Sequence, residues 1–320
     1  MKIEGVVISC YKLDAQLTRA CVASIRFWYP RLPIWLLKDR NYGDFNTHEI
    51  EQHWDVRVYP DRQKNLGWGF GKLEVMTELP ERRLLILDSD VVFAGRVIER
   101  LEASSEDFVV NKEEFKLPGI EEQFFRLDRM RRLDPAFAFP GYGFNTGQIA
   151  ATTGRITKKD FEGLLNWQAR TVMHPEIFQK GEQGLLNYVI LRKLQQGKLT
   201  IRREPFMVWP GAAGRTEHIQ TKDFTPEGRH QQLIHWAGLR WGKALEEMPR
   251  SEILLHFEAM YYRRVPLGGW LRRWRRARIG VERRVVTPIK TVAKGILSRQ
   301  KAAGPVTLSA AKDLQFLRSK

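Results

Sequence analysis

Apolar runs and helical patterns alternate along most of the chain. Short apolar runs predict strands over residues 6–9, 33–37, 84–87 and 108–110, and residues 201–203 are a further candidate strand. Apolar residues that recur every three or four positions predict helices over residues 15–29, 71–79, 160–172 and 184–194. Pro30 and Pro80 end the first two helices. This order of strands and helices favours an α/β fold with a mainly parallel central sheet.

A different pattern begins at Gly268. Apolar residues at helical spacing form a stripe that comprises Trp270, Trp274, Val281, Val285, Ile289, Val292 and Ile296. Four arginines, Arg275, Arg276, Arg283 and Arg284, lie away from this stripe. Pro288 divides the segment, so we predict two basic amphipathic helices.

The charge distribution separates this segment from the rest. The 320-residue chain has a net charge of +16, but residues 261–320 alone contain 16 Lys and Arg residues and only two acids. Residues 1–260 are therefore nearly neutral, which disfavours nucleic acid as the partner of the main domain. We predict a catalytic domain over residues 1–262 and a basic tail over residues 263–320.

The compartment is predicted from what the sequence lacks. The apolar stretch that follows Met1 is too short for a secretion signal, and no run approaches the roughly 18 apolar residues of a membrane span. Cys10 and Cys21 have no metal-ligand spacing, and we expect both to be buried, reduced thiols. These features predict a cytoplasmic protein.

The sequence Asp88-Ser89-Asp90 follows directly after the apolar run at 84–87. Ligands of open α/β sheets bind where strands end, and residues two apart on an extended chain point to the same side. Two close carboxylates are unfavourable unless a cation lies between them, and Mg²⁺ or Mn²⁺ suits their oxygens. The alternative is a solvated turn in which the acids cap the following segment.

Five blocks of sequence resemble glycosyltransferase family 8, the family that includes glycogenin. They are Phe70-Gly71-Lys72-Leu73, the segment LLILDSDVVFAG at 84–95, Phe144-Asn145-Thr146-Gly147, Gly181-Glu182-Gln183-Gly184-Leu185-Leu186-Asn187, and Ile234-His235-Trp236-Ala237-Gly238. The blocks occur in the order of the family. The resemblance implies a GT-A type single Rossmann-like domain with a mainly parallel sheet, and transfer of a hexose from a UDP-sugar with retention at the anomeric carbon.

The resemblance also assigns roles to residues. It implies Asp88, Asp90 and His235 as ligands of Mn²⁺ or Mg²⁺. It implies a catalytic group made of Glu182, Gln183 and Asn145. The donor would contact Ser9, Cys10, Lys72, Asp88, Ser89, Asn145, Thr146 and Gly238. The residue types fit these roles, because amides both donate to and accept from sugar hydroxyls and a lysine provides a point charge for a phosphate.

Two positions depart from the family pattern. Glu182 stands where the family has Asp, which shifts the carboxylate by about one methylene. Trp241 stands where the family has a lysine. Either Arg240 or Lys243 would then contact the diphosphate, or the loop would have a different shape and a different donor.

Three interpretations of the basic tail are possible. A basic amphipathic helix with tryptophans fits an anionic membrane surface, a position packed on the catalytic domain, or an RNA-binding arm. Bacterial members of the family often attach to the inner membrane face through such segments. The first reading therefore predicts a peripheral protein with a glycan or lipid-linked acceptor.

Two other functions compete with sugar transfer. A nucleotidyltransferase would use the same acid pair to hold a nucleoside triphosphate, but it needs neither the block around His235 nor the block around Glu182. In a nucleic-acid-binding protein, the acid pair would be structural and the basic tail would carry all of the binding.

Overall fold

The structure, a computed structural model, describes residues 1–39, 44–60, 69–78, 80–169, 171–211, 215–238 and 243–281. The chain divides into two compact units, Met1–Pro266 and Leu267–Lys320. The boundary predicted between residues 262 and 263 falls in the last turn of helix α8 (Ser251–Arg263).

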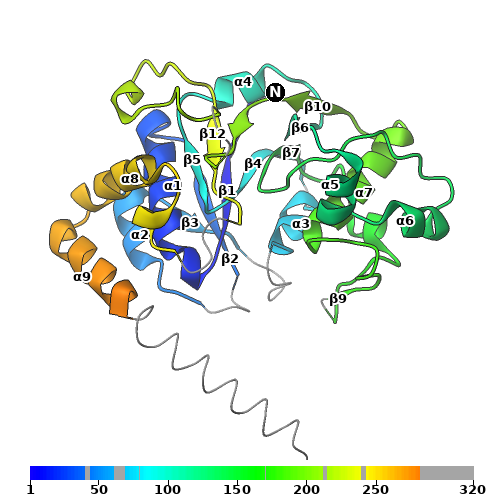
Figure 1. Ribbon diagram of the computed structural model, residues 1–320, viewed down its shortest axis with the longest axis horizontal. Helices are drawn as coiled ribbons and strands as arrows, with labels where there is room; N and C mark the ends of the chain where they lie inside the picture. Colours follow the sequence, from blue (N-terminus) through cyan, green and yellow to red (C-terminus); the bar gives the residue numbers. More distant parts are fainter. Residues whose placement is uncertain are drawn as a thin grey trace, which may run out of the picture. The chain divides into compact units, whose positions relative to one another are not determined.

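The first unit is built on a seven-stranded sheet of order β10-β6-β7-β4-β1-β2-β3 (Figure 1). Its strands are β1 (Gly5–Cys10), β2 (Ile34–Lys38), β3 (Arg57–Val58), β4 (Arg83–Asp88), β6 (Phe108–Asn111), β7 (Gln148–Thr152) and β10 (Ile201–Glu204). Strand β7 is antiparallel to β4 and β6, and the other neighbours are parallel. The five predicted strands are confirmed. In β1 and β4 the lack of alternation reflects burial of both faces of the sheet.

Helices cover both faces of this sheet (Figure 1). On one side lie α1 (Ala15–Trp28), α2 (His48–Trp54) and α8. On the other side lie α3 (Gly71–Met76), α5 (Leu117–Gln123), α6 (Leu127–Leu133) and α7 (Glu182–Gln195). A short helix, α4 (Ile98–Glu102), follows β5. The helices predicted over 15–29, 71–79 and 184–194 correspond to α1, α3 and α7, and Leu79 lies outside the described residues.

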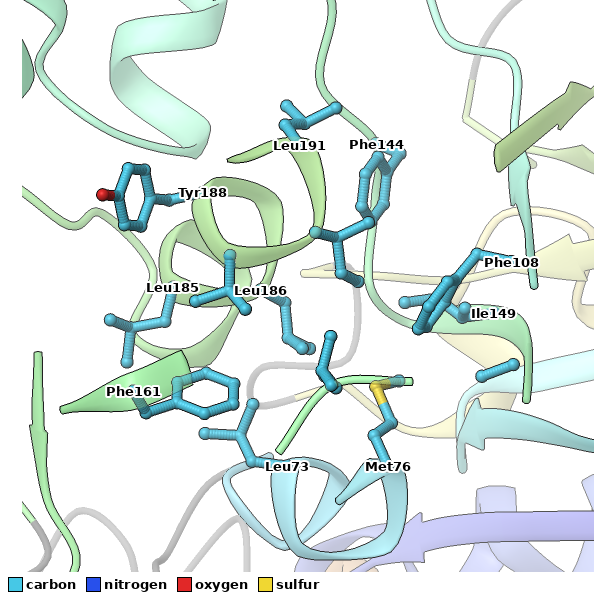
Figure 2. Packing of buried hydrophobic residues seen from close by; sticks show 14 of the residues in the cluster. Leu73, Met76, Phe108, Phe144, Ile149, Phe161, Leu185, Leu186, Tyr188 and Leu191 are labelled. Atoms are coloured by element: carbon cyan, nitrogen blue, oxygen red, sulfur yellow. The ribbon is translucent and has the colours of Figure 1, made fainter. Parts of the chain in front are cut away.

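One apolar cluster joins α3 and α7 to the sheet. Figure 2 shows Leu73 and Met76 of α3 near Leu185 and Leu186 of α7, with Phe108 and Ile149 from the strands. All six side chains are fully buried. Burial of a side chain of this size contributes about 1.5 to 3 kcal/mol, so the cluster holds the start of α7 firmly against the sheet.

A smaller sheet has the order β11-β12-β5, with β11 (Met207–Val208), β12 (Leu233–His235) and β5 (Val91–Phe93). The described residues of the unit also contain 3-10 helices at Lys12–Asp14, Lys158–Phe161, Thr221–Asp223 and Leu245–Glu247.

The helix predicted over 160–172 is wrong. The 3-10 helix ends at Phe161, and a hairpin of β8 (Leu165–Asn166) and β9 (Thr171–Val172) follows it. Gly163 has a φ of +75°, in the left-handed region that a helix interior does not contain. The apolar residues that suggested a helical face instead cover the cluster from a loop and a hairpin.

The two cysteines are buried free thiols, as predicted. Burial raises the pKa of both, so the thiolate form is disfavoured.

The second unit contains helix α9 (Gly268–Val281), which begins where the helical stripe was predicted. The indole rings of Trp270 and Trp274 stack with centroids 6.3 Å apart, and Arg278 lies over the ring of Trp274 at 5.7 Å. Both tryptophans are exposed. Val281 is the last residue of α9, and Pro288 and the residues of the predicted stripe from Val285 onward lie outside the described residues. No helix in the described part of the chain is long and apolar enough to span a membrane.

Candidate active site

The candidate site lies at the edge of the sheet where β4 ends. Asp88 is the last residue of β4, and its N–H donates to the carbonyl of Gly147 at 2.8 Å. The next N–H, from Ser89, donates to the carbonyl of Ser9 at 3.1 Å. Because β7 is antiparallel, its start meets the end of β4 at this edge. Residues that precede β7 therefore join those that follow the parallel strands.

The three predicted metal ligands meet at this edge. Asp88, Asp90 and His235 each offer a ligand atom, and these atoms lie within 4.8 Å of one another. His235 is brought there by pairing of β12 with β5, in which it lies opposite Val91. The N–H of Trp236 also donates to the carbonyl of Asp90 at 2.9 Å. The antiparallel ladder thus connects the Asp-Ser-Asp segment with a histidine far along the chain.

The surroundings of His235 fit a divalent cation. Its imidazole is 1% exposed, and neither ring nitrogen has a hydrogen-bond partner among the described residues. Its Nε2 lies 3.2 Å from Oδ1 of Asp90. A Cβ on Gly147 would come within 2.2 Å of Cε1 of His235 and 2.8 Å of Oδ2 of Asp88, so the glycine leaves room between the ligands. A buried nitrogen and two carboxylates form a donor set that suits Mn²⁺ or Mg²⁺.

Lys72 is fixed inside the site rather than mobile. Its ammonium lies 2.6 Å from Oδ1 of Asp88 and 3.7 Å from Oε1 of Glu182, and it donates to the carbonyl of Thr146 at 3.1 Å. Burial alone would lower the pKa of Lys72, but Asp88 and Glu182 hold it above its usual value. The lysine is therefore charged and neutralises part of the carboxylate charge.

Glu182 is the first residue of α7 and faces Lys72. Burial, together with the charge of Asp88, raises its pKa to about 7, although Lys72 opposes this shift. Its carboxylate lies against Gly69, where a Cβ would come within 2.4 Å of Oε1. Glu182 can thus hold or release a proton near neutral pH.

Amide side chains of α7 fix the segment that precedes β7. Asn187 accepts from the N–H of Phe144 at 2.9 Å and donates to its carbonyl at 2.8 Å. Oε1 of Gln183 accepts from Nδ2 of Asn145 at 3.2 Å and from the N–H of Thr146 at 3.3 Å. These bonds join the block at 144–147 to the block at 181–187, and Lys72 connects both of them with Asp88.

The other residues predicted to contact the donor differ in burial and in their contacts. Ser9 and Cys10 end β1, and the thiol of Cys10 is buried. The hydroxyl of Ser89 donates to Oδ2 of Asp14 at 3.0 Å and is buried. Gly238 has a φ of +72° and open space where a Cβ would stand. Arg240 and Trp241 lie outside the described residues, whereas Lys243 is described and exposed.

Glu113 is a site residue that sequence reasoning missed. It follows β6 at the same edge and is 8% exposed, and Asn111 donates to its Oε1 at 3.2 Å. Burial raises its pKa to about 7, and the neighbouring Asn111 and His235 limit the rise. The strand-end rule that selected Asp88 applies equally to Glu113.

Trp209 was also missed. Its indole stacks on the imidazole of His235, with ring centroids 5.1 Å apart and an interplanar angle of 24°. Trp209 follows β11, which pairs with β12 in parallel. No local sequence signal identifies this contact, because it depends on that pairing.

The architecture matches solved glycosyltransferases. The bifunctional glycosyltransferase WbbM, in its apo form, superposes with a TM-score of 0.54 at 14% identity, over 82% of this chain and 52% of WbbM. The apo form of the glycosyltransferase GlyE of Streptococcus pneumoniae TIGR4 superposes with a TM-score of 0.51 at 13% identity, over 85% of this chain and 64% of GlyE. The fold is that of GT-A glycosyltransferases. No protein-family model matches the sequence, and no curated protein does.

The GT-A fold accounts for the sheet and for the edge at which the site lies. This chain spans about half of WbbM and less than two thirds of GlyE, so the likeness covers part of each of those proteins. The predicted α/β class with a mainly parallel sheet is confirmed.

Proposed function

We propose that the protein is a retaining glycosyltransferase of family 8 that moves a hexose from a UDP-sugar to a glycan or lipid-linked acceptor, with Mn²⁺ or Mg²⁺ as cofactor. The observation that carries the proposal is the meeting of Asp88, Asp90 and His235 within 4.8 Å at the strand edge of a GT-A fold. The predicted catalytic amides and Glu182 lie beside this cluster.

Each residue has a chemical task in this proposal. A divalent cation on Asp88, Asp90 and His235 would stabilise the negative charge that develops on the departing diphosphate. Lys72 lies between Asp88 and Glu182 and reduces the repulsion between these carboxylates and an anionic donor. Asn145 and Gln183 orient the sugar through its hydroxyls.

The proposal assigns the role next to the reacting sugar carbon to Glu182, which lies 3.7 Å from the ammonium of Lys72. Its raised pKa of about 7 makes it suited to hold a proton on one side of neutrality and to release it on the other. In a retaining reaction this carboxylate would stabilise the positive charge that develops on the anomeric carbon.

Hydrolysis of a panel of nucleotide sugars, with and without Mn²⁺, tests the proposal. We expect a UDP-hexose to be hydrolysed slowly with Mn²⁺, and chelation by EDTA to abolish the reaction because the diphosphate charge is then uncompensated. A panel that includes a nucleoside triphosphate separates the competing enzyme class. Turnover of the triphosphate alone would favour nucleotidyl transfer, and turnover of neither class of substrate would contradict the proposal.

The same proposal gives the tail a partner. We propose that the second unit binds an anionic membrane surface on the cytoplasmic side, which would bring the enzyme to a lipid-linked acceptor. Helix α9 contains five arginines and no acid, and its two exposed tryptophans lie four residues apart and stack. Residues at this spacing share one face of a helix. Tryptophan and arginine together are typical of helices that lie in the headgroup layer.

Vesicle sedimentation checks this partner. We expect the full chain to sediment with phosphatidylglycerol vesicles and to stay in solution with phosphatidylcholine vesicles. Replacing Arg272, Arg275 and Arg276 with Gln should weaken binding roughly a hundredfold, since each charge near an anionic surface contributes about 1 kcal/mol. Equal binding to both kinds of vesicle, or binding of RNA at the same arginines, would contradict a membrane role.

A further inference from the structure

The stacking of Trp209 on His235 is a contact that the proposed reaction has not yet used. The two rings lie nearly parallel, at an interplanar angle of 24°, with centroids 5.1 Å apart. Trp209 is partly buried, and His235 is almost fully buried. The indole therefore covers one face of the imidazole of a predicted metal ligand.

A histidine that binds a metal needs a fixed ring orientation. In most metal sites, the second ring nitrogen donates to a carboxylate or a carbonyl, and this bond sets the rotation of the ring. Among the described residues, neither nitrogen of His235 has a hydrogen-bond partner. Among these residues, packing and the approach of Nε2 to Asp90 are what orient the ring.

Packing restricts the ring on two sides. Cε1 of His235 lies against Gly147, because a Cβ added to this glycine would come within 2.2 Å of Cε1. The indole of Trp209 covers a face of the ring. Rotation of the imidazole about its Cβ–Cγ bond would push its edge into the indole, so the stacked arrangement keeps Nε2 beside Asp90, at 3.2 Å from Oδ1.

We propose that Trp209 is a positioning residue that holds the imidazole of His235 in the orientation that binds the metal. The inference rests on the metal site of the proposed function. The aromatic face takes the place of the hydrogen bond that usually orients a histidine ligand. Stacking also keeps water away from one face of the ring, which strengthens the interaction of a cation with its ligands.

The parallel pairing of β11 with β12 makes this arrangement possible. Met207 lies opposite Leu233 and Val208 opposite Ile234, and the next residues of the two segments are Trp209 and His235, whose rings stack. The backbone pairing of β11 with β12 therefore brings Trp209 and His235 next to each other, so their rings can stack without spanning the site.

Mn²⁺ binding to the full chain, followed by the electron paramagnetic resonance signal of free Mn²⁺, tests the inference without any substrate. We expect Trp209→Leu to weaken Mn²⁺ binding by about tenfold, the size of effect typical of groups that orient metal ligands. Trp209→Phe keeps an aromatic face and should recover most of the affinity. Trp167→Leu is a matched control, because Trp167 is also partly buried and makes ring contacts, with Phe161 and Lys158.

The thermal unfolding midpoint of each variant separates positioning from folding. Unchanged Mn²⁺ affinity in Trp209→Leu, or an equal loss in Trp167→Leu, would overturn the role of Trp209 while leaving the metal site intact. Absence of Mn²⁺ binding by the wild type, or wild-type affinity in His235→Ala, would overturn the inference together with the metal site.

Discussion

Replacing Asp88 with asparagine is expected to lower metal-dependent hydrolysis of the nucleotide sugar by about a thousandfold. The asparagine has the same shape but lacks the charge that a divalent cation requires. Asp88 contributes in two ways, because one oxygen belongs to the ligand cluster and its Oδ1 lies 2.6 Å from the ammonium of Lys72. The rate with saturating Mn²⁺, compared with the wild type, gives the effect.

The same substitution removes an ion-pair partner from a buried lysine, so folding must be measured alongside. In this variant the ammonium of Lys72 still has Glu182 as a partner, with Oε1 at 3.7 Å. The side chain of Asp88 is 32% exposed, so its charge is partly solvated. We therefore expect a loss of about 2 kcal/mol, less than the penalty for breaking a fully buried pair. The double variant Lys72→Met, Asp88→Asn removes both charges of this pair. Without Lys72 to lower its pKa, the buried Glu182 should be protonated, so the variant should regain stability without regaining activity. Recovery of activity in that variant would show that Asp88 serves the ion pair alone.

Replacing Gly147 with alanine is expected to weaken Mn²⁺ binding by about a hundredfold while the chain still folds. The added Cβ would lie 2.2 Å from Cε1 of His235 and 2.8 Å from both Oδ2 of Asp88 and Oδ1 of Asn145. His235 cannot retreat freely, because Trp209 covers its face. The imidazole or the carboxylate must move, and either movement opens the ligand cluster. Loss of stability should stay near 1 to 3 kcal/mol, as for other overpacked interiors.

Gly119→Ala is the control for this substitution. Gly119 lies in α5, where a Cβ would meet its nearest neighbour, Phe115, at an ordinary 3.6 Å. This variant should bind Mn²⁺ like the wild type. Wild-type affinity in Gly147→Ala as well would mean that the space between Asp88 and His235 is not where a cation is held.

Strands β1 and β4 of the central sheet could be predicted because their side chains are buried on both faces. Val6, Val7 and Ile8 in β1 and Leu84 to Leu87 in β4 are fully buried, so apolar character is continuous and local. Strand β7 was not predicted. It contains Gln148 and the small residues Ala150, Ala151 and Thr152, so it lacks the run of large apolar residues that indicates a buried strand. Small residues are buried there by large neighbours.

The helix predicted over 160–172 failed for a different reason. Its apolar residues have helical spacing, but Gly163 takes a left-handed conformation and the Thr157–Asp160 capping interaction belongs to a single short turn. Periodicity states which residues are buried, and it does not state that the backbone between them is helical.

The meeting of Asp88, Asp90 and His235 was predicted, and so was a place for Lys72 in the site, whereas the burial of Lys72 and the contacts of Glu113 and Trp209 were not. Asp88 and Asp90 follow a strand, and the block around His235 has a recognisable order. Burial of Lys72, Glu113 and Trp209 depends on contacts between distant elements. A lysine, a glutamate and a tryptophan are ordinary surface residues until the sheet places them at one edge.

The reversed direction of β7 has a consequence for how such a site could change during evolution. The C-terminal end of β7 lies at the edge of the sheet away from the site. There the N–H of Thr152 donates to the carbonyl of Asp107, and the N–H of Thr153 donates to the carbonyl of Arg82. The N-terminal end of β7 carries the segment of Asn145 and Thr146 into the site. A lineage could therefore exchange residues ahead of β7 and acquire a new sugar preference, while the anchored end preserves the register of the whole sheet.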